Sequence, residues 1–248
     1  IECFVKRAEV EEIAKQNKMG TEETGRKIRY DFFYEILEKT KSNKIATAHN
    51  ANDNAETVLM NIIRGCGTSG LKGIEANNKQ LIRPLIECSR EEIEEYCKQN
   101  NLNPRIDKTN FENDYTRNKI RNMLIPYIQE NFNPNIIEGI NRLSSLSKQE
   151  NDYLEKETQK AYISIVEEIT NTSISLDLKK FNSLEKVIKS RVVLYTINEL
   201  FKTKNGIEKK HIEDIIKLCS NNIGNKYLIP NKKMKILVKN KKIFFMAN

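Results

Sequence analysis

The stretch KIATAHNANDNAETVLMNIIRG, residues 44–65, joins a short apolar segment to an amphipathic one. Residues 44–48 have the composition of a buried strand, because β-branched and small apolar residues predominate in them. A helical pattern then runs from Asn52 to Arg64, and Gly65 follows where a helix would end. The stretch therefore predicts a strand, a tight junction and a helix.

The same alternation of strand and helix extends over the first half of the chain. We expect two further strands, at residues 3–6 and 81–84. Helical patterns cover residues 8–16, 21–40 (with Thr21 as the capping residue), 89–100 and 114–130. Strands that alternate with helices are typical of an α/β fold, in which helices cover the faces of a parallel sheet.

The pattern changes near residue 132. Asn133-Pro134-Asn135 interrupts the chain, and long helical periodicity follows. It covers residues 136–160, 184–202 and 209–219, and residues 234–246 resemble a strand pair. We therefore expect two domains, an α/β domain over residues 1–131 and a mostly helical one over residues 132–248.

Composition narrows the functional classes. The 248 residues carry 42 Lys and Arg against 34 Asp and Glu, a net charge of +8. No apolar run approaches the ~18 residues of a membrane span, and the first residues lack the apolar core of an export signal. The five cysteines are widely spaced without a CxxC pair, which argues against a disulfide scaffold, a zinc site or an iron–sulfur site and favours the cytoplasm. The basic excess fits a nucleic-acid partner, although a general abundance of Lys and Asn explains it equally well.

The junction between the predicted strand and helix holds the densest set of polar residues. His49 ends the strand, and Asn52, Asp53 and Glu56 fall in the first turns of the helix. Ligands bind at the carboxyl ends of strands in open α/β sheets. Asp53 and Glu56 are three residues apart and share a helical face, so they could hold an ammonium group or a divalent cation. Alternatively, acidic residues in a first turn only complement the helix dipole.

The segment that follows is rich in glycine. Residues 65–70, GCGTSG, match the letters GxGxxG. A dinucleotide-binding loop must follow a strand and open a helix, whereas this segment follows a helix. We interpret it as a helix end and a loop that can approach a ligand closely.

A third pattern lies in DYTRNKIR, residues 114–121. Asp114, Arg117, Asn118 and Arg121 recur at the spacing of one helical face. Two guanidinium groups one turn apart suit a phosphate group. The alternative is a surface ion pair between Asp114 and Arg117, which contributes little.

Four segments in this order resemble the tRNA(Ile)-lysidine synthase family of the N-type ATP pyrophosphatase (PP-loop) group. They are TAHNANDNAET (47–57), RGCGTSGLKGI (64–74), RPL (83–85) and DKTNFENDYTRNKIRNMLIP (107–126). The resemblance covers about residues 1–130 and implies an adenine nucleotide alpha hydrolase-like fold. It implies that ATP, with Mg²⁺, adenylates the wobble cytidine of a tRNA(Ile) with a CAU anticodon, and that lysine then displaces AMP.

The resemblance also implies roles for individual residues. Asp53 and Glu56 match the acidic positions that bind lysine and metal, with their division of labour left open, and Arg117 matches an arginine that stabilises charge on the phosphoryl group. The implied substrate-binding residues are His49, Asn52, Arg64, Asn118 and Arg121, and the loop glycines that could contact the nucleotide are Gly65 and Gly67.

Two departures from the family pattern shape these expectations. Asn52 stands where the family often has a second aspartate, and the SGGxDS phosphate-binding loop is not in the sequence. We therefore expect a chain truncated at its N-terminus and inactive by itself. A tRNA-binding piece without catalysis and a PP-loop cytidine thiolase are the alternatives, although thiolation is usually accompanied by CxxC pairs. The second domain is expected to hold the tRNA, no membrane partner is expected, and a homodimer is left open.

Overall fold

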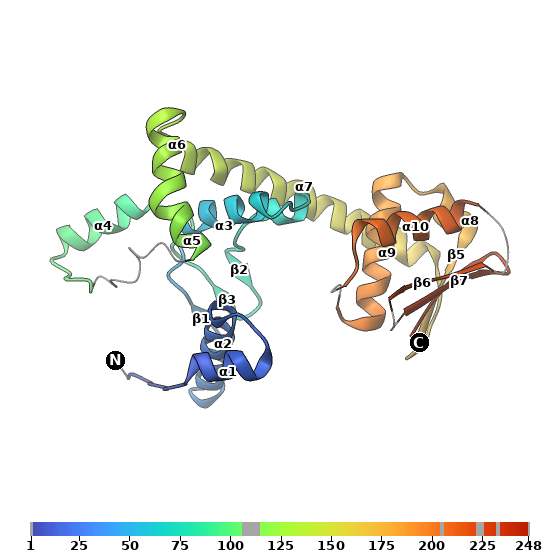
Figure 1. Ribbon diagram of the computed structural model, residues 1–248, viewed down its shortest axis with the longest axis horizontal. Coiled ribbons are helices and arrows are strands. Elements are labelled where there is room, and N and C mark those ends of the chain that lie inside the picture. Colours follow the sequence, from blue (N-terminus) through green and yellow to red (C-terminus); the bar gives the residue numbers. More distant parts are fainter. Residues whose placement is uncertain (1, 106–114, 204–205, 222–225, 232–233, 248) are drawn as a thin grey trace. The chain divides into compact units, whose positions relative to one another are not determined.

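The structure of the protein is a computed structural model (Figure 1). It describes residues 2–105, 115–203, 206–221, 226–231 and 234–247. The chain divides into two compact units, residues 1–148 and residues 149–248.

The sheet of the first unit is small and mixed. Strand β1 (Ile45–Ala46) pairs in parallel with β3 (Leu81–Ile82), and β2 (Asn77–Asn78) pairs with β3 in the antiparallel sense. The order is β1-β3-β2. A mixed α/β structure is confirmed, although the sheet is only partly parallel.

Helical elements alternate with these strands along the chain, and all but a 3₁₀ turn in the glycine-rich segment lie at the expected places. They are α1 (Val10–Asn17), α2 (Thr21–Lys39), α3 (Ala51–Ile63), the 3₁₀ turn η1 (Thr68–Lys72) and α4 (Arg90–Gln99). Asn50 begins α3 and Ser89 begins α4, each in a capping box in which side chains satisfy otherwise unpaired backbone N–H groups. Helix α2 packs against α1 and β1 (Figure 1).

Several local predictions were wrong. The strand expected at residues 3–6 does not form: Val5 is exposed, and no described strand pairs with this segment. Thr21 is the first residue of α2 rather than its cap, which is Gly20. An extended segment without a partner strand leaves its backbone groups to water, so an apolar pattern alone does not make a strand.

The helix expected over residues 114–130 is divided into three parts. They are α5 (Thr116–Lys119), the π-helical turn η3 (Ile120–Leu124) and α6 (Ile125–Asn131). Pro126 has no backbone N–H and its ring clashes with the carbonyl four residues before it, which explains the change in hydrogen bonding. Asp114 lies outside the described residues.

Helix α7 (Ile136–Ile165) begins in the first unit and accounts for the position of the boundary. Ile140 packs with Ala55 and Val58 of α3. The units therefore divide at residues 148/149, whereas the sequence pattern had suggested 131/132. In the described part of the chain, no helix is both long and apolar enough to cross a membrane.

The second unit combines helices with a five-stranded antiparallel sheet of order β4-β5-β8-β7-β6. Its elements are β4 (Val166–Ile169), β5 (Ser173–Asp177), α8 (Leu178–Ser183), α9 (Lys186–Phe201), α10 (Lys209–Ser220), β6 (Lys226–Asn231), β7 (Met234–Lys239) and β8 (Lys242–Ala247). The pair β7 and β8 was predicted. The mostly helical description is incomplete because charged and proline-containing sequences such as VEEI and KYLIPN also form strands here.

One face of this sheet carries the core of the unit. Alternate residues of β7 and β8 are buried in a core to which α9 and α10 also contribute. Phe245 is fully buried, whereas its neighbour Phe244 points to the opposite face and is partly exposed. The period of two along a strand explains the difference.

We expect Phe245→Ala to lower the free energy of unfolding of the second unit by about 3–5 kcal/mol, because it removes a ring from a close-packed core. Phe244→Ala is the matched control, and it should lower the free energy of unfolding by less than about half as much. Urea unfolding followed by circular dichroism measures both. Equal losses would contradict the assigned register of β8.

Candidate functional site

The junction between β1 and α3 holds its polar side chains in defined positions. The Asn50 side chain accepts a hydrogen bond from the Asp53 backbone N–H at 3.0 Å, and the Asp53 carboxylate accepts one from the Asn50 N–H at 3.0 Å. This reciprocal cap begins the helix after a short segment, residues 47–50, that follows the strand. It also orients the Asp53 carboxylate at the carboxyl end of β1.

Two carboxylates and two guanidinium groups form a closed cluster. Glu56, only 1% exposed, accepts hydrogen bonds from Arg117 Nε at 2.8 Å and from Arg121 Nε at 2.6 Å and Nη2 at 2.8 Å. Arg121 Nη2 also donates to Asp53 Oδ1 at 2.9 Å. A buried carboxylate needs such partners because removal from water is costly. The cluster is formally neutral.

The electrostatics of the cluster keep Arg121 charged. Burial by itself lowers the pKa of the Arg121 guanidinium. The hydrogen bonds and charge of Glu56, with the charge of Asp53, outweigh burial and raise that pKa above its ordinary value. Arg121 lies within the π-helical turn η3, a feature frequently found at functional sites.

Two cavities adjoin this cluster. The Asp53 cavity has a volume of about 520 Å³ and is lined by Arg26, Arg29, Tyr30, Phe33, Ala46, Thr47, Ala48, His49, Asp53, Arg117, Asn118 and Arg121. The Arg83 cavity has a volume of about 760 Å³ and is lined by Glu22, Glu23, Arg26, His49, Thr57, Met60, Asn61, Arg64, Gly73, Ile74, Glu75, Asn78, Arg83 and Arg117. Three residues, Arg26, His49 and Arg117, line both.

His49 stands between a carboxylate and several guanidinium groups. Its Nδ1 lies 2.9 Å from Thr47 Oγ1. The pKa of His49 is lowered, chiefly because burial disfavours the imidazolium ion. Asp53 opposes this shift, and the charges of Arg83, Arg117 and Arg26 add to it. The imidazole is therefore neutral at pH 7.

The structure brings most of the predicted site residues together. Asp53, Asn118 and Arg121 line the Asp53 cavity, Arg64 lines the Arg83 cavity, and His49 and Arg117 line both. Glu56 lies behind this wall and contacts the two arginines.

Three predicted residues lie elsewhere. Asn52 Oδ1 accepts a hydrogen bond from the Arg90 N–H at 3.0 Å, so it contacts the start of α4. Gly65, at φ 77°, ends α3, and Gly67 precedes η1. Neither glycine is among the described residues that line the two cavities.

Sequence reasoning missed Arg26 and Arg83. Arg83 lies directly after β3, which pairs with β1, so it is at the same sheet edge as His49. A charged residue at the end of an apolar strand was a usable signal. Arg26 lies within α2, and nothing in the helical pattern of that segment distinguishes it from neighbouring lysines and arginines.

The described residues do not form a metal site of their own. No group of three or more His, Cys, Asp or Glu side chains converges among them. Mg²⁺ commonly binds to one or two carboxylates and to substrate phosphates. Asp53 reaches a cavity and fits that role, whereas Glu56 is enclosed by guanidinium groups.

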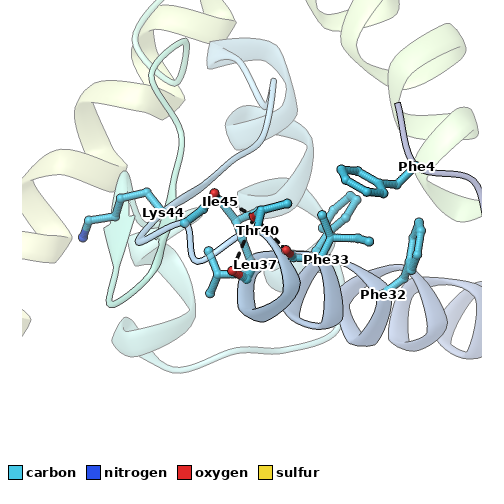
Figure 2. A pocket seen from close by; sticks show the side chains of 9 residues that line it. Phe4, Phe32, Phe33, Leu37, Thr40, Lys44 and Ile45 are labelled. Carbon is cyan, nitrogen blue, oxygen red and sulfur yellow. Dashed lines mark hydrogen bonds between the residues drawn. The ribbon is translucent and has the colours of Figure 1, made fainter. Parts of the chain in front are cut away.

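A separate cavity of about 290 Å³ is mainly apolar. Figure 2 shows the rings of Phe4, Phe32 and Phe33 near it, together with Leu37 and Ile45. Lys44 and two hydroxyl residues, Thr40 and Ser42, are its polar lining. It lacks the converging charges of the other two cavities and carries no evident chemistry.

The sequence has clear relatives. The PP-loop domain matches residues 1–128. A tRNA(Ile)-lysidine synthase of Clostridioides difficile is 44% identical over 97% of this chain and 54% of its own length. One of Clostridium acetobutylicum is 47% identical over 93% of this chain and 50% of its own length. A third, of Thermosipho africanus, is 48% identical over 52% of this chain and 30% of its own length. The chain thus spans about half the length of the first two of these curated relatives.

We expect Glu56→Gln to destabilise the first unit by about 2–3 kcal/mol, because it leaves two partly buried guanidinium groups without their main counter-ion. Glu94→Gln, at an exposed position of α4, is the control and should have little effect. Urea unfolding measures both. Equal stability of the two variants would show that Glu56 is not the centre of the cluster.

We expect the His49 imidazole to titrate below its ordinary pKa of 6.5, and Asp53→Asn to lower that pKa further because Asp53 favours the charged form. The neutral ring is favoured in the folded state, so its contribution to stability is full above pH 6.5 and declines as the pH falls below that value. NMR titration is direct because the chain has only two histidines. A midpoint above 6.5 would contradict the site electrostatics.

Proposed function

The chain belongs to the PP-loop family, and from this premise we propose that the protein uses ATP to attach lysine to the wobble cytidine of a tRNA(Ile) with a CAU anticodon. The cytidine is first adenylated, with release of pyrophosphate, and a lysine amine then displaces AMP to form lysidine. The observation that carries the proposal is the cluster of Asp53, Glu56, Arg117 and Arg121 at the carboxyl end of β1. Similarity to tRNA(Ile)-lysidine synthases over nearly the whole chain supports it.

In this proposal the Asp53 carboxylate binds the lysine amine. It lines a cavity and is 18% exposed, so a ligand can reach it, whereas Glu56 is closed to solvent. An ammonium group next to a carboxylate forms a charge-assisted hydrogen bond. Neutral His49, in the same cavity wall, can accept a hydrogen bond or a proton from that amine.

Arg117 and Arg121 stabilise charge on the transferred adenylyl group. Both guanidinium groups face the Asp53 cavity, and both are held by Glu56 before substrate binds. Preoriented positive charge lowers the barrier to adenylyl transfer, because it does not need to reorganise during the reaction. In this way Glu56 acts as a positioning residue. Mg²⁺ bound with ATP would neutralise phosphate charge through the phosphate oxygens, and Asp53 is left to the amine in this proposal.

We propose that residues 1–131 belong to the catalytic domain and that residues 132–248 help to hold the tRNA. The excess of lysine and arginine over acidic residues supports a partner with a phosphate backbone. We propose that Asn118 and Arg64, which line the two cavities, bind substrate. A cytoplasmic location, a homodimer and a role for the loop glycines stay predictions.

The test is lysine incorporation by the intact protein, with ATP, labelled lysine and the CAU-anticodon tRNA(Ile). Product and AMP should form together and require all three substrates. Absence of lysine transfer would refute the proposal. tRNA binding without AMP release would favour a binding role, and sulfur incorporation into cytidine would favour a thiolase.

We expect Asp53→Asn to raise the KM for lysine by about tenfold or more while the KM for ATP changes less, because a charge-assisted hydrogen bond to the amine is lost. Asn retains an oxygen that can cap α3. Asp31→Asn, at an exposed position of α2 outside both cavities, is the control. An equal rise in both KM values would indicate that Asp53 supports the structure of the site and does not bind lysine.

A further inference from the structure

Arg83 is a buried cation whose hydrogen bonds are incomplete. It is 8% exposed, and Arg83 Nη1 donates to the backbone carbonyl of Glu75. Its Nε is buried and has no hydrogen-bond partner among the described residues. Buried polar groups are nearly always paired, so an unpaired one at a cavity calls for an explanation.

The fold holds Arg83 firmly at this position. Its backbone N–H donates to the Ala76 carbonyl at 2.9 Å, and the preceding residue, Ile82, accepts from the Thr47 N–H at 3.0 Å. Arg83 thus lies at the same sheet edge as His49, which it influences electrostatically. A guanidinium group held in this way loses little freedom when a ligand binds.

Four arginines and three glutamates line the Arg83 cavity. Arg26 and Arg64 line it with Arg83, and Arg117 closes the side shared with the Asp53 cavity. Glu22 and Glu23 are exposed in the first turn of α2, and Glu75 Oε1 lies 3.8 Å from Lys72 Nζ, so the one buried charge of this lining is the Arg83 guanidinium.

We infer that the Arg83 cavity is a phosphate-binding subsite in which Arg83, Arg64 and Arg26 bind the oxygens of one anionic phosphate group. Guanidinium groups match phosphate because each can donate two parallel hydrogen bonds to it. A volume of about 760 Å³ has room for such a group with its attached atoms. Because His49 and Arg117 line both cavities, the bound phosphate would adjoin the site of lysine attachment.

The phosphate could belong to the nucleotide, as pyrophosphate does, or to the RNA backbone beside the reacting base. The choice between these two sources rests on the proposed function, but the subsite itself does not. The two sources are separated by using inorganic pyrophosphate as one probe and an anticodon stem-loop RNA as the other. A second RNA, with an uncharged methylphosphonate beside the wobble cytidine, removes a single backbone charge.

We expect Arg83→Gln and Arg64→Gln each to weaken binding of one probe by about tenfold or more, as measured by isothermal titration calorimetry with the intact protein. Arg90→Gln, at an exposed position of the first unit that lines neither cavity, is the matched control and should change binding by less than about twofold. A loss confined to pyrophosphate identifies the nucleotide. Weaker binding of the stem-loop RNA alone identifies the RNA backbone as the source of the phosphate. In that case the substitutions should not weaken binding of the methylphosphonate RNA.

Binding of both probes unchanged in both variants would overturn the subsite. Arg64 is exposed, so Arg64→Gln should fold, and Arg83→Lys retains charge if Arg83→Gln proves unstable. The calorimetric measurement of probe binding does not depend on lysine transfer. Dependence of probe binding on Arg83 without any lysidine formation would therefore refute the proposed function and leave the subsite supported.

Discussion

The burial of the Glu56 carboxylate in α3 is the constraint on which the first unit depends. Its two guanidinium partners come from residues 61 and 65 positions further along the chain, so the ion pairs join α3 to α5 and η3. A carboxylate that is 1% exposed cannot be left unpaired without a large penalty. The fold must therefore bring the arginine-bearing segment to this helix.

A second buried polar residue of α3 joins the helix to the rest of the unit. Asn54 accepts a hydrogen bond from the Ile74 N–H at 2.6 Å and donates to Asn141 of α7 at 2.8 Å. Gly73 makes this approach possible: its φ is 64°, and a Cβ there would lie 2.1 Å from Asn54 Oδ1. One face of α3 thus sets the positions of the glycine-containing loop and α7, and this explains why α7 begins in the first unit.

The sequence predicted those elements that residues close together in the chain determine. The β1–α3 junction was recognisable from an apolar run and a helical period, although its cap at Asn50 was not predicted, and His49, Asp53 and Arg117 followed from it or from the spacing of DYTRNKIR. Features that depend on tertiary partners were not predictable. Residues 3–6 have a strand-like composition but no described partner strand, and Asn52 is turned towards α4 by the Arg90 N–H. The importance of Arg83 depends on its burial, which a pattern of residue types does not contain.

Arg117 connects the two cavities, and arginine side chains outnumber acidic ones in the lining of each. In the Asp53 cavity the carboxylate is bonded to Arg121 and partly exposed, whereas in the Arg83 cavity a guanidinium group is the buried charged side chain. Arg117 lines both and is also bonded to Glu56, so its position is set from behind by a residue that no ligand reaches. A neutral His49 in the shared wall adds no charge to either side. In the proposed reaction the amine would contact the Asp53 carboxylate and the phosphate would contact arginines, on the two sides of the wall that His49 and Arg117 form.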